Sequence, residues 1–373
     1  MTDRLDFNKI FYNGDRVTTL LEKGDITPIH MTLGFTGYCD HQCLWCTVDH
    51  LHSLRREERN KVDIDPDNLL AFLKEAYQEG LKAVTIVGSG EPLLHSKAKY
   101  MLDEMKKMGL DIGMFSNGSQ FPKHVDTLLK NMTFVRVSLD AATIETHRKL
   151  HGGHPQSFNY AIDGLREMAK RRIGKFPTLG MQFVASQHNV HEIEKAALLA
   201  KEIGLDYISY KPMMKNPKNP THDKNMLVLD ENLQEIFKKV KAFETNGFKV
   251  YTKPEQFEQV LTRETFNQYK DYALCLGHFF SPYIDSDGTV YVCTEKNSEP
   301  GFAYGSINNV GFKEMWNSSR RRDIIRSIDL NHCFAACRQD PLNKILWGLS
   351  EDEVKRKTEK VGDPDPSIHP NFV

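Results

Sequence analysis

The sequence predicts an α/β protein in which six βα units are followed by a smaller second domain. Between about residues 29 and 253, short apolar runs alternate with amphipathic stretches of helical length, a pattern typical of a parallel sheet covered by helices. Beyond about residue 272, short strands and turns replace this alternation. At 373 residues the chain is longer than most single domains, which favours one large domain with an appendage.

The apolar runs predict six strands, at 29–35, 83–87, 111–115, 134–139, 178–184 and 207–211. Helical periodicity is clear at 66–80, 97–108, 157–171 and 190–203. A stretch rich in Lys, Asn and Pro at 213–225 predicts an exposed loop, and a helical segment at 229–246 follows it. The expected domains are an N-terminal extension at 1–28, the βα domain at 29–253, the second domain at 254–340 and a tail at 341–373.

The composition is that of an ordinary globular protein. Lys and Arg total 49 and Asp and Glu total 50, so no global field favours binding to a nucleic acid. No run approaches the roughly 20 apolar residues of a membrane span, and the N-terminus lacks the basic and apolar segments of a signal peptide. We therefore expect a cytoplasmic protein with no nucleic-acid or membrane partner.

Residues that follow the predicted strands indicate where ligands bind, and a turn sequence indicates where the second domain begins. Small or polar residues follow several strands, and parallel α/β folds bind ligands at the carboxyl ends of their strands. These residues are Gly88, Asn117, Asp140 and Ser186. The turn sequence DSDG at 285–288 lies between two β-rich runs and predicts a hairpin at the start of the second domain.

Seven cysteines fall in two distant groups, which is a poor disulfide framework and favours metal binding. The first group, Cys39, Cys43 and Cys46, lies on one loop after the first strand. Three thiolates leave one iron of a four-iron cluster open, so an exogenous ligand could complete the site. A structural zinc site that uses His41, His50 or His52 as a fourth ligand is the alternative.

The spacing CxxxCxxC, with Trp45 before the last cysteine, resembles the motif of the radical S-adenosylmethionine (radical SAM) superfamily. The resemblance implies a partial (β/α)6 TIM-like barrel and a 4Fe-4S cluster with three cysteine ligands. It implies that S-adenosylmethionine chelates the open iron and is cleaved to methionine and a 5'-deoxyadenosyl radical. An electron donor such as flavodoxin or ferredoxin would be a partner.

The same resemblance implies which residues bind the cofactor. The segment Gly88, Ser89, Gly90 and Glu91 looks like the family's GGEP segment, which binds the cofactor's amino group. The other candidates follow the third and fourth strands and are Asn117, Ser138, Asp140 and Arg148. Alternatives remain open: an ordinary βα turn for the glycine segment, a solvated strand end for Asp140 and an exposed helical position for Arg148.

The second cysteine group is Cys275, Cys293, Cys333 and Cys337, with Gly288 before the second cysteine. This pattern resembles the twitch domain, a shortened relative of the SPASM domain, and implies one auxiliary 4Fe-4S cluster with four cysteine ligands. A structural zinc knuckle is the alternative. The two groups together use every cysteine of the chain, so no thiol remains to donate a hydrogen atom to a substrate radical.

The resemblance to twitch enzymes favours oxidation of an alcohol on a small polar substrate, a sugar or an aminocyclitol, with the auxiliary cluster as electron acceptor. Gln182 and Lys211 are the expected substrate contacts, because strand alternation turns them toward the barrel lumen. Solvated strand ends are the alternative for both. Other candidate functions are a peptide-modifying maturase, which the short N-terminal extension disfavours, a radical epimerase and a non-catalytic zinc-binding protein.

Overall fold

The computed structural model describes residues 3–46, 62–214, 232–262, 270–334 and 337–373. Its described strands form one sheet in the order β10-β9-β8-β1-β2-β3-β4-β5-β6-β7. The strands are β1 (His30–Gly34), β2 (Ala83–Val87), β3 (Asp111–Ser116), β4 (Phe134–Ser138), β5 (Thr178–Ala185), β6 (Tyr207–Pro212), β7 (Lys249–Tyr251), β8 (Tyr283–Ile284), β9 (Thr289–Tyr291) and β10 (Ala303–Ser306). Strands β1 to β7 run parallel to their neighbours, which confirms the predicted fold class.

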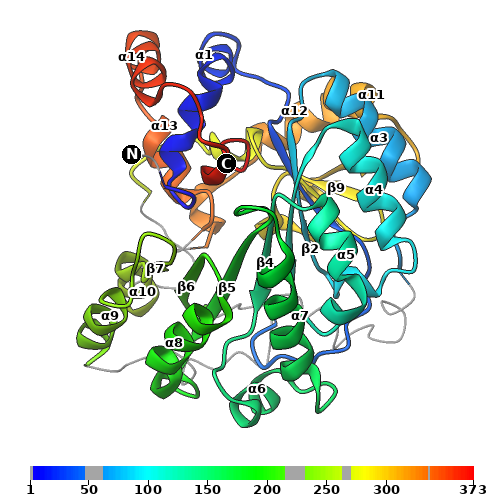
Figure 1. The fold of residues 1–373 in the computed structure, drawn as a ribbon. Helices are drawn as coiled ribbons and strands as arrows, with labels where there is room; N and C mark the ends of the chain where they lie inside the picture. Colours follow the sequence, from blue (N-terminus) through cyan, green and yellow to red (C-terminus); the bar gives the residue numbers. More distant parts are fainter. Residues whose placement is uncertain (1–2, 47–61, 215–231, 263–269, 335–336) are drawn as a thin grey trace.

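Helices cover the outer face of the curved sheet (Figure 1). They are α3 (Pro66–Gln78), α4 (Ala98–Met108), α5 (Phe121–Asn131), α6 (Ile144–His151), α7 (Ser157–Arg171), α8 (Ile193–Ile203), α9 (Leu233–Lys241) and α10 (Pro254–Thr262). Each of the four helices given a range from periodicity is present. The segment expected to be helical to residue 246 ends earlier, at α9, because a turn from Thr245 to Phe248 leads into β7. Most of the loop predicted at 213–225 lies outside the described residues.

The core lies between the sheet and these helices. Met101, Leu102 and Met105 of α4 are fully buried, as the helical spacing requires, and they pack in the same cluster as Ile112 and Met114 of β3. Asp65 caps α3 by accepting a hydrogen bond from the Asn68 amide, and Pro66 takes the first helical position. The capping residues of α3 and the burial pattern of α4 therefore both support the helices predicted from the sequence.

The second domain joins the barrel through the sheet itself. The predicted hairpin is present as β8 and β9, and β8 pairs parallel to β1 through Thr32 with Tyr283 and Leu33 with Ile284. Backbone amides of His30 and Thr32 donate to the carbonyls of Phe280 (3.2 Å) and Pro282 (2.9 Å). Helices α11 (Phe312–Trp316) and α12 (Ser319–Arg326) follow β10. The sheet is open, since β7 and β10 are its two edges.

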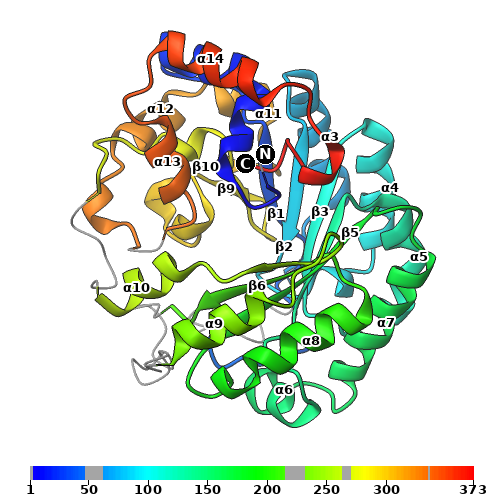
Figure 2. The same ribbon diagram turned by 60° about the vertical axis from the view of Figure 1, so that its left-hand side comes forward.

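Segments from both ends of the chain pack together beside the barrel (Figures 1 and 2). They are η1 (Phe7–Asn13), α1 (Gly14–Lys23), α13 (Asp340–Leu346) and α14 (Glu351–Val361). Ile10, Phe11, Leu342 and Val354 form a second apolar core there. Other short 3-10 helices are η2 (Pro92–Leu94), η3 (Val190–Glu192), η5 (Gly277–Phe279), η6 (Thr294–Lys296), η7 (Pro300–Phe302), η8 (Leu330–His332) and η9 (Pro366–Ile368). None of the described helices is both long and apolar enough to cross a membrane.

Candidate active site

The loop that carries the first three cysteines follows β1 and is fixed to the barrel by backbone hydrogen bonds. Gln42 and Leu44 donate from their amides to the carbonyls of His151 (2.7 Å) and Leu150 (2.9 Å) at the end of α6. The Glu91 amide donates to the Tyr38 carbonyl at 2.8 Å. These bonds tie the described part of the loop, to Cys46, to the barrel.

The glycines after β2 allow this loop to lie close to the barrel. A Cβ atom on Gly90 would be 2.0 Å from the Tyr38 carbonyl oxygen, and one on Gly88 would be 1.4 Å from the Gly90 carbonyl oxygen. Both neighbours are backbone atoms that cannot rotate away. Glycine is required here for close packing of two backbone segments.

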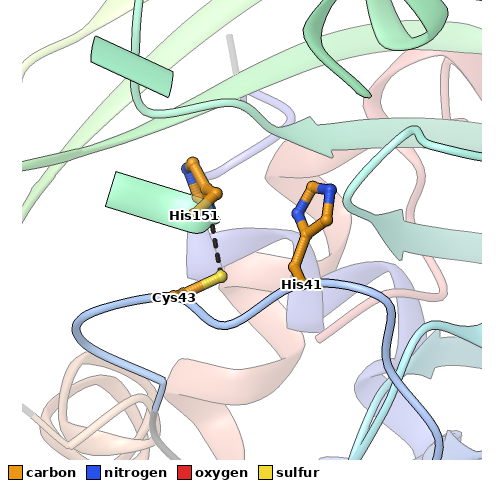
Figure 3. Close-up of side chains that lie close together, drawn as sticks. All are labelled: His41, Cys43 and His151. Carbon is orange, nitrogen blue, oxygen red and sulfur yellow. Dashed lines mark hydrogen bonds between the residues drawn. The ribbon is translucent and has the colours of Figure 1, made fainter. Parts of the chain in front are cut away.

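A buried histidine connects the cysteine loop to the end of β4 (Figure 3). The Nδ1 atom of His151 lies 3.0 Å from Cys43 Sγ. Its Nε2 atom lies 3.0 Å from the Leu139 carbonyl oxygen and 3.3 Å from Asp140 Oδ2. Because both neighbours of Nε2 are acceptors, this nitrogen carries the hydrogen. A neutral His151 therefore offers Nδ1 as an acceptor to the Cys43 thiol.

His41 lies beside this pair, and the donor atoms of His41, Cys43 and His151 are all within 4.8 Å of one another. Among the described residues, neither ring nitrogen of His41 has a hydrogen-bond partner. Burial lowers the pKa of His41 to about 4, which keeps the imidazole neutral and able to bind a metal. The other two histidines of the zinc alternative, His50 and His52, lie outside the described residues.

Two thiols of the first group, Cys39 and Cys43, have surroundings that suit a positively charged metal group. Burial raises the pKa of Cys39 to about 12 and that of Cys43 well above its usual range, and each thiolate is further disfavoured by its neighbouring cysteines. Metal binding requires thiolates. A cationic iron–sulfur or zinc centre would supply the charge that offsets both effects.

The second cysteine group lines one cavity of about 650 Å³. It contains all four remaining cysteines, Cys275, Cys293, Cys333 and Cys337. Burial raises the pKa of each thiol, to about 11 in the case of Cys333, and the negative charge of Cys275 adds to the shift in the other three. Asn343 of α13 donates to Cys275 Sγ at 3.5 Å. Because a neighbouring thiolate raises the pKa of three of these cysteines, a cationic metal group in this cavity would stabilise the ionised cysteines.

Two predicted cofactor residues lie next to the first cysteine loop. Glu91 is buried and accepts hydrogen bonds from Ser116 Oγ and from the Asn117 amide, both at 2.8 Å. Burial raises the pKa of Glu91 to about 7. The Asn117 side chain donates to Asp40 Oδ1 at 2.8 Å and lies 3.9 Å from Cys39 Sγ. Residues at the carboxyl ends of β2 and β3 therefore contact the first cysteine loop, as expected if ligands bind at the carboxyl ends of parallel strands.

Three other predicted cofactor residues have different surroundings. Ser89 bonds to Tyr283 and Asp285 of the hairpin. Asp140 is buried rather than solvated, and with a φ of 54° it turns back to accept a bond from the Val184 amide at 2.6 Å. Arg148 is exposed on α6, so the structure does not bring its side chain into the site.

Polar side chains form a layer across the inner face of the sheet. Ser138, Gln182 and Ser209 are register neighbours on β4, β5 and β6 and therefore share a face. Among the described residues, Gln182 Oε1 and Ser209 Oγ are buried without a hydrogen-bond partner. Buried polar atoms are almost always paired, so these two are candidates for ligand contact.

The lumen contains a cavity of about 260 Å³ with a strongly basic lining. Arg136 lies over the ring of Phe115 with its guanidinium carbon 3.5 Å from the ring centroid. Lys211 and Lys253 also line the cavity, and burial lowers the pKa of Lys253 to about 7 and that of Lys211 well below its usual range. Glu295 lines both this cavity and the four-cysteine cavity, so the two adjoin.

Several of these residues did not follow from the sequence. Strand alternation places Arg136 on the lumen face, but Arg136 was not among the predicted site residues. Ser209 lies two residues before Lys211 on the same strand, so the same alternation also places it on the lumen face. His151 and Glu295 reach the site through tertiary packing, for which the sequence carries no signal. Lys253 follows β7, a strand of three residues that was too short to predict.

Comparisons with known proteins agree with this geometry. The family model for the radical SAM superfamily matches residues 33–200, and the SPASM iron-sulfur cluster-binding domain matches residues 275–339. The tungsten-containing aldehyde ferredoxin oxidoreductase cofactor-modifying protein of Pyrococcus furiosus is 22% identical over 327 residues, which cover 83% of this chain and 86% of that protein. The GTP 3',8-cyclase of Marinobacter nauticus is 24% identical over 226 residues, which cover 60% of this chain and 65% of the cyclase.

Solved structures share the fold at low identity. SuiB of Streptococcus suis bound to the precursor peptide SuiA has a TM-score of 0.65 and 16% identity, with 90% of this chain and 79% of that chain covered. The enzyme anSMEcpe with bound AdoMet has a TM-score of 0.60 and 15% identity, with 93% of this chain and 96% of that chain covered. At these identities the likeness concerns the architecture alone.

Proposed function

Because the chain is a radical SAM enzyme with a C-terminal SPASM-type iron–sulfur domain, we propose that it oxidises a small polar molecule bound in the barrel lumen. The observation that carries this proposal is that the lumen cavity and the four-cysteine cavity adjoin at Glu295. A molecule in the lumen would therefore lie next to the second cysteine group. That position suits a reaction in which this group accepts an electron from the substrate.

In this proposal Cys39, Cys43 and Cys46 hold a 4Fe-4S cluster with one open iron. The acceptor nitrogen of His151 can take the proton that Cys43 loses when it binds iron. S-adenosylmethionine would lie at the ends of β2 to β4, against Gly90, Asn117 and Ser138. Gly90 lets the cysteine loop lie close to the end of β2, and Ser138 has a hydroxyl on the lumen face.

The remaining cysteines, Cys275, Cys293, Cys333 and Cys337, would hold a second 4Fe-4S cluster. When bound, S-adenosylmethionine and the two clusters would supply the redox chemistry: with one external electron, removal of a hydrogen atom from a substrate carbon, followed by acceptance of one further electron as the substrate loses a proton. The residues that line the lumen would hold the substrate beside the second site. The net change in the substrate is loss of two electrons and two protons.

A sugar or an aminocyclitol alcohol is the proposed substrate class. The names of two relatives support a small molecule, since one modifies a cofactor and the other cyclises GTP. The cavity of about 260 Å³ also suits a small molecule, because it falls slightly below the roughly 300–1,000 Å³ of most ligand sites. Peptide modification and epimerisation are the alternative reactions. SuiB, which was solved in complex with its precursor peptide, has the same fold as this chain.

An anaerobic assay of the reconstituted protein tests the proposal. Iron and sulfide should be bound in amounts that correspond to two clusters, and reduction in the presence of S-adenosylmethionine should release 5'-deoxyadenosine. With a deuterated substrate, the label should move into 5'-deoxyadenosine and the product should be oxidised. Zinc in place of iron, or a product at the oxidation level of the substrate, would contradict the proposal.

A further inference from the structure

Resting on the proposed function, we infer that the substrate carries a negatively charged group, a carboxylate or a phosphate, which binds the basic residues of the lumen. Six basic residues line the cavity: Arg4, Lys9, Arg136, Lys211, Lys253 and Arg338. Glu295 is the one acidic residue among the described residues that line it. Natural proteins rarely bury so many like charges together without a counter-charge.

Three basic residues at the centre of the lumen have little counter-charge. Among the described residues, no carboxylate forms an ion pair with Arg136, Lys211 or Lys253, although Glu295 is near enough to favour the charged form of Lys211. The Nε atom of Arg136 is buried without a hydrogen-bond partner. Arg4 and Lys9 differ, because Arg4 Nε donates to the Ser367 carbonyl (2.8 Å) and Lys9 Nζ to the Arg4 carbonyl (2.9 Å). Arg136 of β4 also hydrogen-bonds to the Tyr207 side chain, so its Nε atom is the donor left for a ligand.

The protein holds these charges in place by local structure. Lys253 has a φ of 47°, a left-handed conformation that is costly for a residue other than glycine and that tends to occur at functional sites. The ring of Phe115 supports the Arg136 guanidinium, and Gly180 leaves space for the Tyr207 ring, which a Cβ atom would approach to 2.2 Å. Burial and the neighbouring Arg136 lower the pKa of Lys253, as expected for a site that lacks its counter-charge.

This charge distribution separates the two substrate types of the proposed function. An aminocyclitol bears ammonium groups, which the basic lining would repel. A sugar that bears a carboxylate or a phosphate would neutralise the lining. The lumen therefore favours an acidic sugar or a similar hydroxylated acid over an aminocyclitol.

Four sugars with one ring size and different charges test the inference. They are D-glucuronate, D-glucose 6-phosphate, D-glucose and D-glucosamine, and inorganic phosphate serves as a probe without a ring. Binding is measured anaerobically by calorimetry at pH 6.5, on full-length protein with its clusters reconstituted and S-adenosylmethionine at saturation. Saturation excludes the cofactor's own carboxylate site. Comparison of glucuronate with glucose 6-phosphate distinguishes a carboxylate from a phosphate.

We expect at least one of the anions to bind, with glucose at least tenfold weaker and glucosamine weaker still. Lys253→Gln and Arg136→Gln should each weaken anion binding roughly tenfold to a hundredfold, as expected for loss of one charged hydrogen bond. Lys249→Gln is the matched control, since Lys249 is exposed on β7. It should leave anion binding unchanged.

The inference is overturned if glucose or glucosamine binds as tightly as the anions, if no anion binds, or if Lys253→Gln and Lys249→Gln behave alike. The wild-type series decides the matter even where a variant does not fold. Release of 5'-deoxyadenosine by the wild-type protein is measured in parallel. Release without anion binding contradicts this inference alone, whereas absence of release contradicts the proposed function.

Discussion

The two cysteine groups are held in different ways. Cys39, Cys43 and Cys46 lie on one short loop whose backbone is bonded to the end of α6 and to Glu91. The second group gathers from separate segments, and Cys275 and Cys333 are separated in the chain by the whole of β8 to α12. In the first group, backbone hydrogen bonds position the loop. In the second, the segments are distant in sequence, so we expect a bound group to contribute more to holding them together.

The largest effect should come from the first group. Changing Cys43 to Ala should abolish release of 5'-deoxyadenosine, because the cluster with an open iron would lose one of its three protein ligands. The fold and the second cluster should remain, since backbone bonds rather than the metal hold the loop. Release is measured by chromatography, and the remaining iron is measured by analysis. Release at the wild-type rate would show that this loop does not hold the catalytic cluster.

Cys293→Ala should affect a different step. The variant should cleave S-adenosylmethionine and abstract hydrogen yet give little oxidised product, because the substrate radical has lost its electron acceptor. The ratio of 5'-deoxyadenosine to product should therefore rise. Because the second group depends on its metal, thermal unfolding and circular dichroism must accompany the assay. An unchanged ratio in a folded variant would contradict the acceptor role.

Gly90→Ala tests how the first cysteine loop is positioned, without changing any cysteine. The new Cβ atom would clash with the Tyr38 carbonyl, so the cysteine loop must shift, at a cost of about 1–3 kcal/mol. Iron in the first site should fall while the second site stays filled. Gly301→Ala is the control, because nothing lies within 4 Å of its added Cβ atom. Equal iron content in the two variants would mean that Gly90 does not position the loop.

Ser138→Ala tests the cofactor contact at the end of β4. Loss of one hydrogen bond to a charged cofactor group should weaken S-adenosylmethionine binding roughly tenfold to a hundredfold. Equilibrium binding to the reconstituted protein measures the dissociation constant. An unchanged constant would remove Ser138 from the cofactor site and leave it as part of the lumen layer.

The smallest predicted effect concerns pH and the basic lumen cavity beside the second group. Lys253, which faces Arg136 and Arg338, has a pKa of about 7 in the absence of an anion. An anion binds the protonated form, so glucuronate affinity should fall as the pH rises above 7, by at most about tenfold per unit. Calorimetry at pH 6.5 and 8.5 measures the change, which Lys253→Gln should reduce. An affinity that rises with pH would contradict this assignment.

Strand periodicity and cysteine spacing were sufficient to predict the barrel, the hairpin and the family. These features depend on residues that are close in sequence, such as Cys39, Cys43 and Cys46. Pairing of β8 with β1 was not predicted, because no local pattern specifies which distant strand extends a sheet edge. For the same reason the hydrogen bond from Ser89 to Asp285 of the hairpin was not predicted, and its cofactor contact stays a prediction.

The shared sheet also bears on the timing of the reaction. Since β8 continues the barrel sheet from β1, the region that carries the second cysteine group, the proposed electron acceptor, is joined to the barrel by backbone hydrogen bonds. Proteins whose redox centres lie on separate mobile domains must wait for closure, a motion that takes microseconds to milliseconds. In this protein, electron transfer from a substrate radical to the second site would not require domain closure. Its rate would depend on a fixed distance between the two, so we expect this step to be insensitive to solvent viscosity.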